Sequence, residues 1–166
     1  IDDLVTKGCS DPYRMMTSRS EYRLLLRQDN ADQRLTRRGY DIGLVSEERL
    51  RAVEEKYAAV DREIRRLTHT GASPSPALSA FLAERGTADV TDGCPLAALL
   101  RRPQLHYDDL APFDPTRPDL PADVREQVEI RVKYEGYIQR QQKQVEEFRR
   151  MESHRLPPGL DYASIQ

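Results

Sequence analysis

The chain has 166 residues and a formal net charge of −2, and its charged residues (33%) are nearly as frequent as its hydrophobic ones (38%). With three Phe and no Trp, this composition suits the seams between packed helices rather than a thick core around a sheet. No apolar run approaches the length of about 18 residues that a membrane-spanning helix needs, which excludes a transmembrane protein. Cys9 and Cys94 are far apart and form no CxxC motif, so we expect neither a disulfide framework nor a zinc site, and we expect a reducing, cytoplasmic location.

Two short helices are predicted near the start of the chain. Ser18 and Glu21 have the spacing of a capping box, in which each side chain satisfies the free backbone N–H of the other residue. Asn30 is a suitable cap for a second helix, which would end at Gly39 or Gly43.

The clearest element is a long amphipathic helix that Ser46 caps and that ends before Gly71. Its apolar residues recur every three or four positions, which places them on one stripe of a helix of about six turns. The stripe consists of Leu50, Val53, Tyr57, Val60, Ile64 and Leu67.

The middle of the chain is less regular. We expect a short helix over Ala77–Glu84 that Gly86 closes, a second over Pro95–Arg102 that begins at the proline, and a third over His106–Leu110. A proline-rich connector, residues 112–118, follows.

The last long segment runs from Pro121 to about Ser153. Residues 128–134 alternate between apolar and charged, which is typical of a strand, whereas the wider spacing from Val124 to Phe148 fits a helix. Its length and the lack of a turn signal favour one continuous helix.

We therefore predict a mainly α fold: a helical bundle with two long antiparallel helices and several short ones, preceded by an irregular arm. Residues 1–40 would form an arm or linker from a preceding domain, and residues 41–166 the bundle domain. Both ends of the chain are expected to be cut from a longer protein.

An arginine-rich segment between Arg14 and Arg38 carries the functional signal. It holds seven arginines, no lysine and three acidic residues, so it is +4 in a chain that is −2. On a helix, Arg19, Arg23 and Arg27 would form a row with steps of about 6 Å. The planar guanidinium donates two hydrogen bonds and suits phosphate groups, which predicts contact with nucleic acid.

The same arginines have a plainer interpretation. An arginine-rich face also pairs with acidic residues of a neighbouring domain, and Arg27 has Asp29 and Asp32 close by in the sequence. The local sequence leaves both interpretations open.

We find no catalytic, cofactor-binding or metal-binding constellation. The carboxylates of Asp108 and Asp109 are adjacent and would diverge on a helix. The stretch between Gly39 and Gly43 lacks the GxGxxG pattern of a phosphate-binding loop. The three histidines are isolated and lack the spacing of metal ligands: His69, His106 and His154.

Two long blocks resemble one known family. The block DPYRMMTSRSEYRLLLRQDNADQRLT, residues 11–36, and the block EQVEIRVKYEGYIQRQ, residues 126–141, resemble the C-terminal part of the GidA/MnmG family in the same order. Residues 2–8 and 156–162 also fit the family, while residues 70–120 match loosely.

This resemblance implies a fragment of a flavoprotein that modifies tRNA. Family members act with an MnmE-type GTPase to add a carboxymethylaminomethyl or aminomethyl group at carbon 5 of the wobble uridine. They use FAD, NADH and methylenetetrahydrofolate, form homodimers, and carry their cofactor sites in an N-terminal domain that this chain lacks. The GTPase-docking tail is expected to begin just beyond Gln166.

The resemblance also sharpens the site. It implies that Arg14 and Arg23 are the leading tRNA-binding residues, with Arg19 and Arg27 in support, and it favours helix over strand at residues 128–134. The alternative is a purely structural spacer whose arginines pair with the flavin domain. With its charge of −2, the chain alone is expected to bind RNA weakly.

Overall fold

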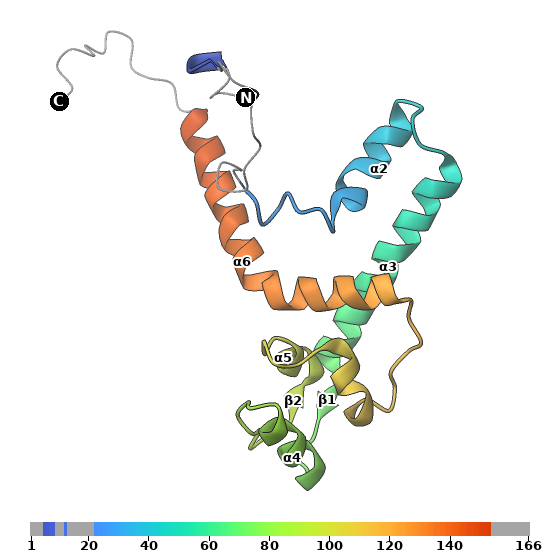
Figure 1. The fold of residues 1–166 in the computed structure, drawn as a ribbon, viewed down its shortest axis with the longest axis vertical. Helices are drawn as coiled ribbons and strands as arrows, with labels where there is room; N and C mark the ends of the chain where they lie inside the picture. Colours follow the sequence, from blue (N-terminus) through green and yellow to red (C-terminus); the bar gives the residue numbers. More distant parts are fainter. Residues whose placement is uncertain (1–4, 9–11, 13–21, 154–166) are drawn as a thin grey trace, which may run out of the picture.

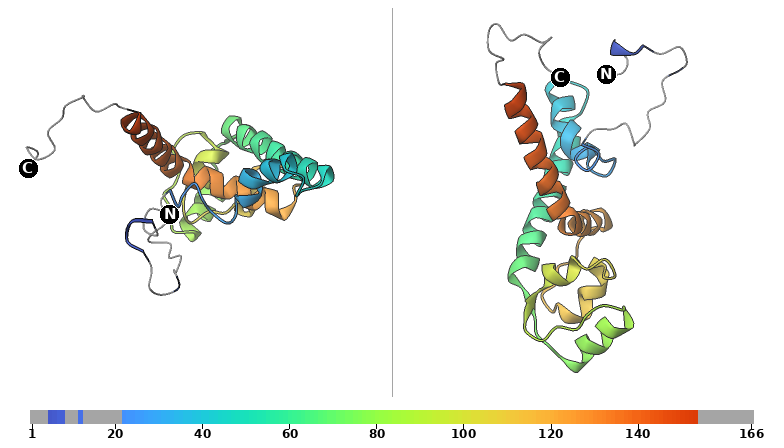
Figure 2. Two further views of the ribbon diagram at one scale, coloured as in Figure 1. Left: turned by 90° about the horizontal axis from the view of Figure 1, so that it is seen from above. Right: turned by 90° about the vertical axis from the view of Figure 1, so that its left-hand side faces the viewer.

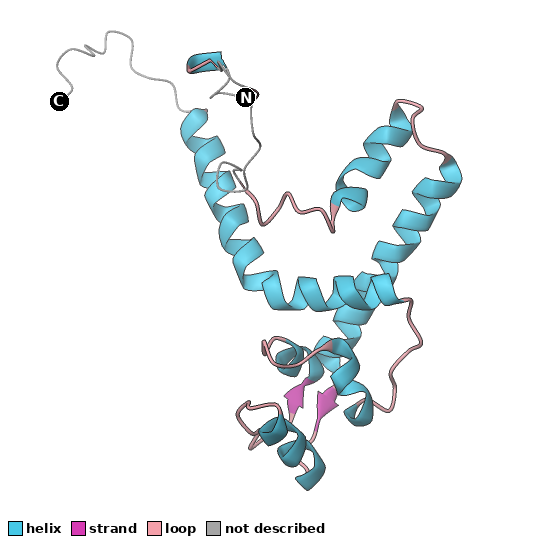
Figure 3. Ribbon diagram, in the orientation of Figure 1, coloured by secondary structure: helices cyan, strands magenta, loops and turns pink. Residues whose placement is uncertain are grey.

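The computed structural model describes residues 5–8, 12 and 22–153, and it is mainly helical (Figures 1 and 3). The predicted mainly α class is confirmed. The elements in chain order are α2 (Ala31–Asp41), α3 (Glu47–His69), β1 (Gly71–Ala72), α4 (Pro76–Glu84), β2 (Cys94–Pro95), α5 (Leu96–Leu100), the 3-10 helix η2 (Tyr107–Phe113) and α6 (Ala122–Glu152). No described helix is both long and apolar enough to cross a membrane.

Helix α3 forms where the sequence predicts it. The Ser46 hydroxyl accepts a hydrogen bond from the Arg49 amide and caps the helix. The predicted apolar stripe faces the core, with Ile64 partly buried and the other five members buried: Leu50, Val53, Tyr57, Val60 and Leu67. Burial of this stripe, rather than helix propensity, stabilises the element.

The short elements pack below α3 (Figure 1). Strands β1 and β2 pair antiparallel, with Ala72 opposite Cys94; β1 precedes α4 and β2 precedes α5. Ser75 caps α4, and Gly86, with a φ of 63°, follows its end. The predicted helix over Pro95–Arg102 is shorter, and the predicted third helix is the 3-10 helix η2. The fully buried leucines at the centre are Leu67, Leu78, Leu82, Leu96, Leu99, Leu100 and Leu105.

Helix α6 is one continuous helix, as the length of its segment indicates. Val124, Val128 and Val132 recur every four residues on one face and are buried, so the first half of α6 packs on the core. This half crosses α3, where Arg131 bonds to Asp61. The helix then bends, and its second half leaves the core and runs back in the opposite sense to α3 (Figures 1 and 2).

The predicted first helix is wrong over the residues that the structure describes. Residues 22–30 form successive turns instead, and Tyr22 has a φ of 53°. The Leu25 and Leu26 amides both donate to the Tyr22 carbonyl. The second helix, α2, is present and has Asn30 at its N-cap position, although the Asn30 side chain makes no capping hydrogen bond.

Candidate nucleic-acid interface

Residues 22–30 of the arginine-rich segment lie against α6. The Leu25 amide donates to Gln141 Oε1 over 3.1 Å, and Gln127 Nε2 donates to the Asp29 carbonyl over 3.2 Å. Gln127 is only 4% exposed, so its side of this partly buried contact is shielded from solvent. The two blocks that mark the sequence are therefore in contact in the folded chain, and α6 positions the turns of residues 22–30.

Arg27 is engaged within these turns. Its Nε and Nη2 atoms bond to the two carboxylate oxygens of Asp29 over 2.9 and 3.0 Å, and its Nη1 atom donates to the Leu24 carbonyl. The hydrogen bond from Arg27 is the largest influence on Asp29 and lowers the pKa of that carboxyl group below its ordinary value. This bidentate pair stabilises the shape of the turn.

Arg34 and Asn30 close the same hydrogen-bond network. Arg34 Nε donates to Asn30 Oδ1 over 2.9 Å, and Arg34 Nη2 donates to the Arg27 carbonyl over 3.2 Å. Asn30 Nδ2 donates to the Leu25 carbonyl over 2.9 Å. These side chains satisfy the backbone carbonyls that a helix would otherwise have used, so residues 24–30 are held in a defined non-helical shape.

Arg23 differs from Arg27. Its side chain is exposed, and among the described residues it has no recorded hydrogen bond or ion pair. Arg14 and Arg19 lie outside the described residues. Because residues 22–27 are not helical, the expected row of equally spaced guanidinium groups does not extend from Arg23 to Arg27.

The other arginines of the segment lie on α2. Arg37 pairs with Glu54 of α3, and both side chains are more than half exposed. Arg38 is exposed and has no recorded partner within the described part of the chain. Arg23 and Arg38 are therefore the cations of residues 22–38 that remain available to an anionic ligand.

The sequence left Asp29 and Asp32 open as partners of Arg27. In the structure Arg27 pairs with Asp29, and Asp32 has other partners. It accepts hydrogen bonds from Tyr57 Oη over 2.6 Å and from Lys56 Nζ over 3.0 Å, both on α3. Desolvation opposes the charged form of Asp32, but these hydrogen bonds prevail and lower its pKa. Burial, together with the bond to Asp32, raises the pKa of Tyr57. These contacts fasten α2 to α3.

A buried charged cluster that the sequence did not reveal ties η2 and the connector to α3. Arg66 Nη2 bonds to Glu63 Oε1 over 2.7 Å and to Asp114 Oδ2 over 2.5 Å, and Tyr107 Oη donates to the same Glu63 oxygen over 2.7 Å. Glu63 and Asp114 are 3% and 4% exposed. The bonds to Glu63 and Asp114 raise the pKa of Arg66. The cluster has a structural role, because its charged groups are bonded to one another.

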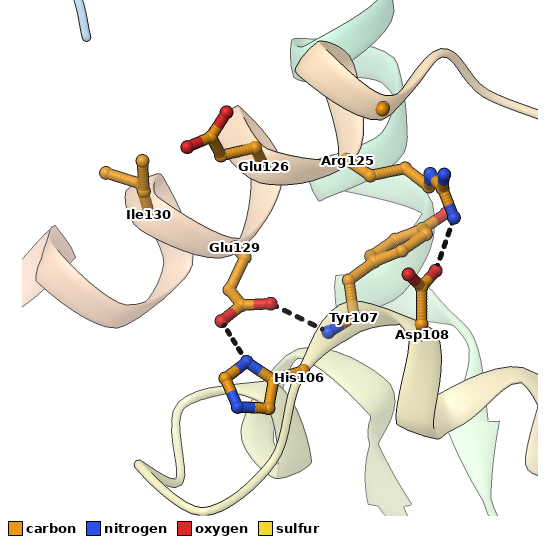
Figure 4. A pocket seen from close by; sticks show the side chains of 8 residues that line it. His106, Tyr107, Asp108, Arg125, Glu126, Glu129 and Ile130 are labelled. Atoms are coloured by element: carbon orange, nitrogen blue, oxygen red, sulfur yellow. Dashed lines mark hydrogen bonds and ion pairs between the residues drawn. The ribbon is translucent and has the colours of Figure 1, made fainter.

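An open pocket of about 470 Å³ lies between η2 and α6 (Figure 4). Glu129 accepts a hydrogen bond from the Tyr107 amide over 2.9 Å and contacts His106 Nδ1 over 2.8 Å. Asp108 pairs with Arg125 over 2.6 Å, and the buried Arg125 Nε atom has no recorded partner. Because these carboxylates already serve other groups, the pocket presents no nucleophile beside a free base. Its lining residues are His106, Tyr107, Asp108, Ala122, Arg125, Glu126, Glu129 and Ile130.

The remaining candidates for chemistry are separated. Asp108 pairs with Arg117 and Arg125, whereas Asp109 pairs with Arg85, so the adjacent carboxylates diverge. Within the described ranges, no group of three or more His, Cys, Asp or Glu residues could hold a metal ion. Cys94 is a free, partly buried thiol, and Cys9 lies outside the described residues.

Comparisons with known proteins agree with one another. Residues 47–142 match the family model described as the C-terminal helical domain of the tRNA-modifying enzyme MnmG/GidA. The chain is 52% identical to the tRNA uridine 5-carboxymethylaminomethyl modification enzyme MnmG of Caldicellulosiruptor saccharolyticus, over 99% of the chain and 26% of that protein. It is 47% identical to the enzyme of the same name from Bacillus subtilis, over 100% of the chain and 26% of that protein.

A solved structure shows the same relationship. The form II crystal structure of Aquifex aeolicus GidA superposes with a TM-score of 0.72 at 35% sequence identity, covering 99% of this chain and 25% of that one. The chain thus spans about a quarter of the length of the relatives that it matches.

Proposed function

Because the chain belongs to the MnmG/GidA family, we propose that it is the C-terminal helical part of an enzyme that modifies carbon 5 of the wobble uridine in tRNA. The names of its relatives support the reaction, and their greater length supports the placement of this chain within a larger enzyme. In that enzyme, this part contacts tRNA and holds the docking tail for an MnmE-type GTPase at a defined distance from the catalytic domain. The enzyme is a cytoplasmic homodimer.

The residues of this chain do not fit FAD or NADH. A dinucleotide site needs a strand that leads through a glycine-rich turn into a helix. Within the described ranges, the strands are β1 and β2, with two residues each, and neither is followed by such a turn. We therefore assign FAD, NADH and methylenetetrahydrofolate to the part of the enzyme that lies outside this chain.

The exposure of Arg23 is the observation that carries the tRNA-binding role. Arg27 and Arg34 stabilise the turn of residues 22–30, and Gln127 and Gln141 bond it to α6. The backbone that carries Arg23 therefore has a defined shape before tRNA binds. A fixed support lowers the entropy lost when a side chain binds a phosphate. Arg14 and Arg19, which precede this turn in the sequence, complete the proposed contact, with Arg27 acting in support.

The test is tRNA binding by the full-length enzyme as a function of salt concentration. We expect Arg23→Ala, and separately Arg14→Ala, to weaken binding and to lower the slope of log Kd against log salt by about 1, because each removes a phosphate contact. Arg51→Ala is the control, since Arg51 is 70% exposed and pairs with Glu47 of its own helix. Unchanged affinity and slope in both the Arg14 and Arg23 variants would disprove the role.

A structural spacer is the second candidate function. The ion pairs of Arg27 with Asp29 and of Arg37 with Glu54 favour it, because they show arginines of this segment serving the fold. In that case Arg23 would pair with an acidic residue of the catalytic domain. Its replacement would then lower the melting temperature of the full-length enzyme and leave tRNA affinity unchanged, and exchanging the charges of the two partners would restore stability.

A further inference from the structure

The second half of α6 carries an exposed aromatic and cationic ladder. Tyr134 is 43% exposed and Tyr137 is 55% exposed, and their ring centroids lie 6.3 Å apart. The guanidinium carbon of Arg140 lies 4.9 Å from the centroid of the Tyr137 ring. The three residues follow one another at intervals of three positions, so each side chain reaches the next along the helix.

The ladder lies next to the proposed tRNA contact. Gln141 follows Arg140 directly, and its side chain bonds to Leu25, two residues from Arg23. Tyr134, Tyr137 and Gln141 are spaced i, i+3 and i+7, which places them on one face of α6. The turn that supports Arg23 therefore lies against the same face of the helix as the two rings.

The charge around the ladder is positive. Residues 139–145 contain Arg140 and Lys143 and no acidic residue. Glu135, the acidic residue next to Tyr134, pairs with Arg101 over 2.6 Å, and Glu146 and Glu147 lie beyond this stretch. Glutamines occupy most of the other positions in this stretch, so its surface is polar and cationic rather than continuously apolar. This chemistry complements a polyanion better than it complements the apolar surface of a protein.

We propose that Tyr134, Tyr137 and Arg140 form a stacking site for unpaired nucleotides of the tRNA, beside the phosphate contact of Arg23. The inference rests on the proposed function and deepens it. Exposed aromatic rings and guanidinium planes stack on RNA bases that are not paired in a double helix. Because every base has a π face, such a site binds nucleotides with little dependence on their sequence. Arg23 and Arg140 contribute positive charge that attracts the phosphates of the tRNA backbone, while the rings of Tyr134 and Tyr137 stack on the bases.

The test measures tRNA affinity and the salt slope of the full-length enzyme with Tyr134→Leu and Tyr137→Leu. Leucine keeps an apolar side chain of moderate size and removes the ring. We expect each variant to bind tRNA about 5- to 100-fold more weakly with an unchanged salt slope, because stacking releases no counterions. Tyr137→Phe keeps the ring and should bind like the wild type. Tyr40→Leu is the control, because Tyr40 is 37% exposed on α2 and has no recorded ring or cation contact within the described chain.

The outcomes separate the stacking site from the proposed function. If the leucine variants bind tRNA like the wild type while Arg23→Ala loses slope, the stacking site is disproved and the phosphate contact stands. If neither kind of variant changes binding, both proposals fail. A lower melting temperature without tRNA in the leucine variants would assign this face to packing against another protein domain and overturn the stacking site.

Discussion

Gln127 and Asp29 are 98 positions apart in the sequence, yet Gln127 Nε2 lies 3.2 Å from the Asp29 carbonyl oxygen and 3.4 Å from its Oδ2 atom. The contact joins the first half of α6 to the turn that presents Arg23. It also links stability to the proposed function, because Asp29 is the partner that holds Arg27.

We expect Gln127→Leu to loosen residues 22–30 without unfolding the helices. The substitution removes the donor to Asp29, and a lost hydrogen bond of a partly buried group costs about 1–3 kcal/mol. Hydrogen exchange at the Leu25 amide should become faster, and the full-length enzyme should bind tRNA more weakly. Gln142→Leu, on the exposed side of α6, is the control; equal protection of Leu25 in both variants would refute the link.

Arg27 and Arg23 should differ in their effects on stability. Arg27→Ala leaves the Asp29 carboxylate without its bidentate partner, and since the pair is only 17% and 26% exposed, we expect a loss of about 1–2 kcal/mol in the free energy of unfolding. Arg23→Ala should change this free energy by less than about 0.5 kcal/mol, because Arg23 is exposed. Urea unfolding of the chain measures both. Equal losses would mean that Arg23 is also structural.

Acid should destabilise the fold through the carboxylates whose pKa values are lowered. Burial opposes the charged form of Asp114, but hydrogen bonds from Arg66 and Thr116 lower its pKa below the usual value. A lowered pKa in the folded state means that the unfolded chain takes up its proton first. The stabilisation from Asp114 is therefore complete above the unfolded pKa of about 3.9 and is lost as the pH falls through the folded pKa.

The check on this pH dependence is urea unfolding between pH 7 and pH 2.5 with Asp114→Asn. We expect the variant to be less stable than the wild type at pH 7, by about 1–3 kcal/mol, because it weakens the charged hydrogen bonds that the buried Asp114 carboxylate accepts from Arg66. The difference should shrink as the pH falls below about 4. A constant difference over this range would show that the pairing of Asp114 does not cause the acid sensitivity.

Gly136 is the only glycine in α6, which bends about halfway along its length (Figure 1). A Cβ atom at this position would meet nothing within 4 Å. Alanine loses less backbone freedom than glycine in a helix, so Gly136→Ala should stabilise the chain by about 0.5–1 kcal/mol. Thermal unfolding measures this change. Gly86→Ala, at a φ of 63°, should be destabilising and serves as the contrast.

The sequence alone was enough to predict those elements whose signal lies in neighbouring residues. The Ser46 cap and the three- and four-residue spacing of the apolar stripe predict α3, because a buried helix face needs that period whatever it packs against. The two long blocks indicate the family, and the comparisons confirm it. For α6, the pattern of residues 128–134 was ambiguous, and the length of the segment and the resemblance decided for helix.

Only the tertiary structure decided which arginines are available and what shape carries them. Ser18 and Glu21 predicted a helix that would continue through Arg23, but Gln141 takes the Leu25 amide as a hydrogen-bond donor, and the side chains of Arg27 and Asn30 take the carbonyls of Leu24 and Leu25. Gln141 is 116 positions from Leu25, and a contact at such a separation leaves no periodic pattern in the sequence. The roles of Arg23 and Arg27 differ for the same reason, since ion pairing depends on distances that exist only after α6 has packed.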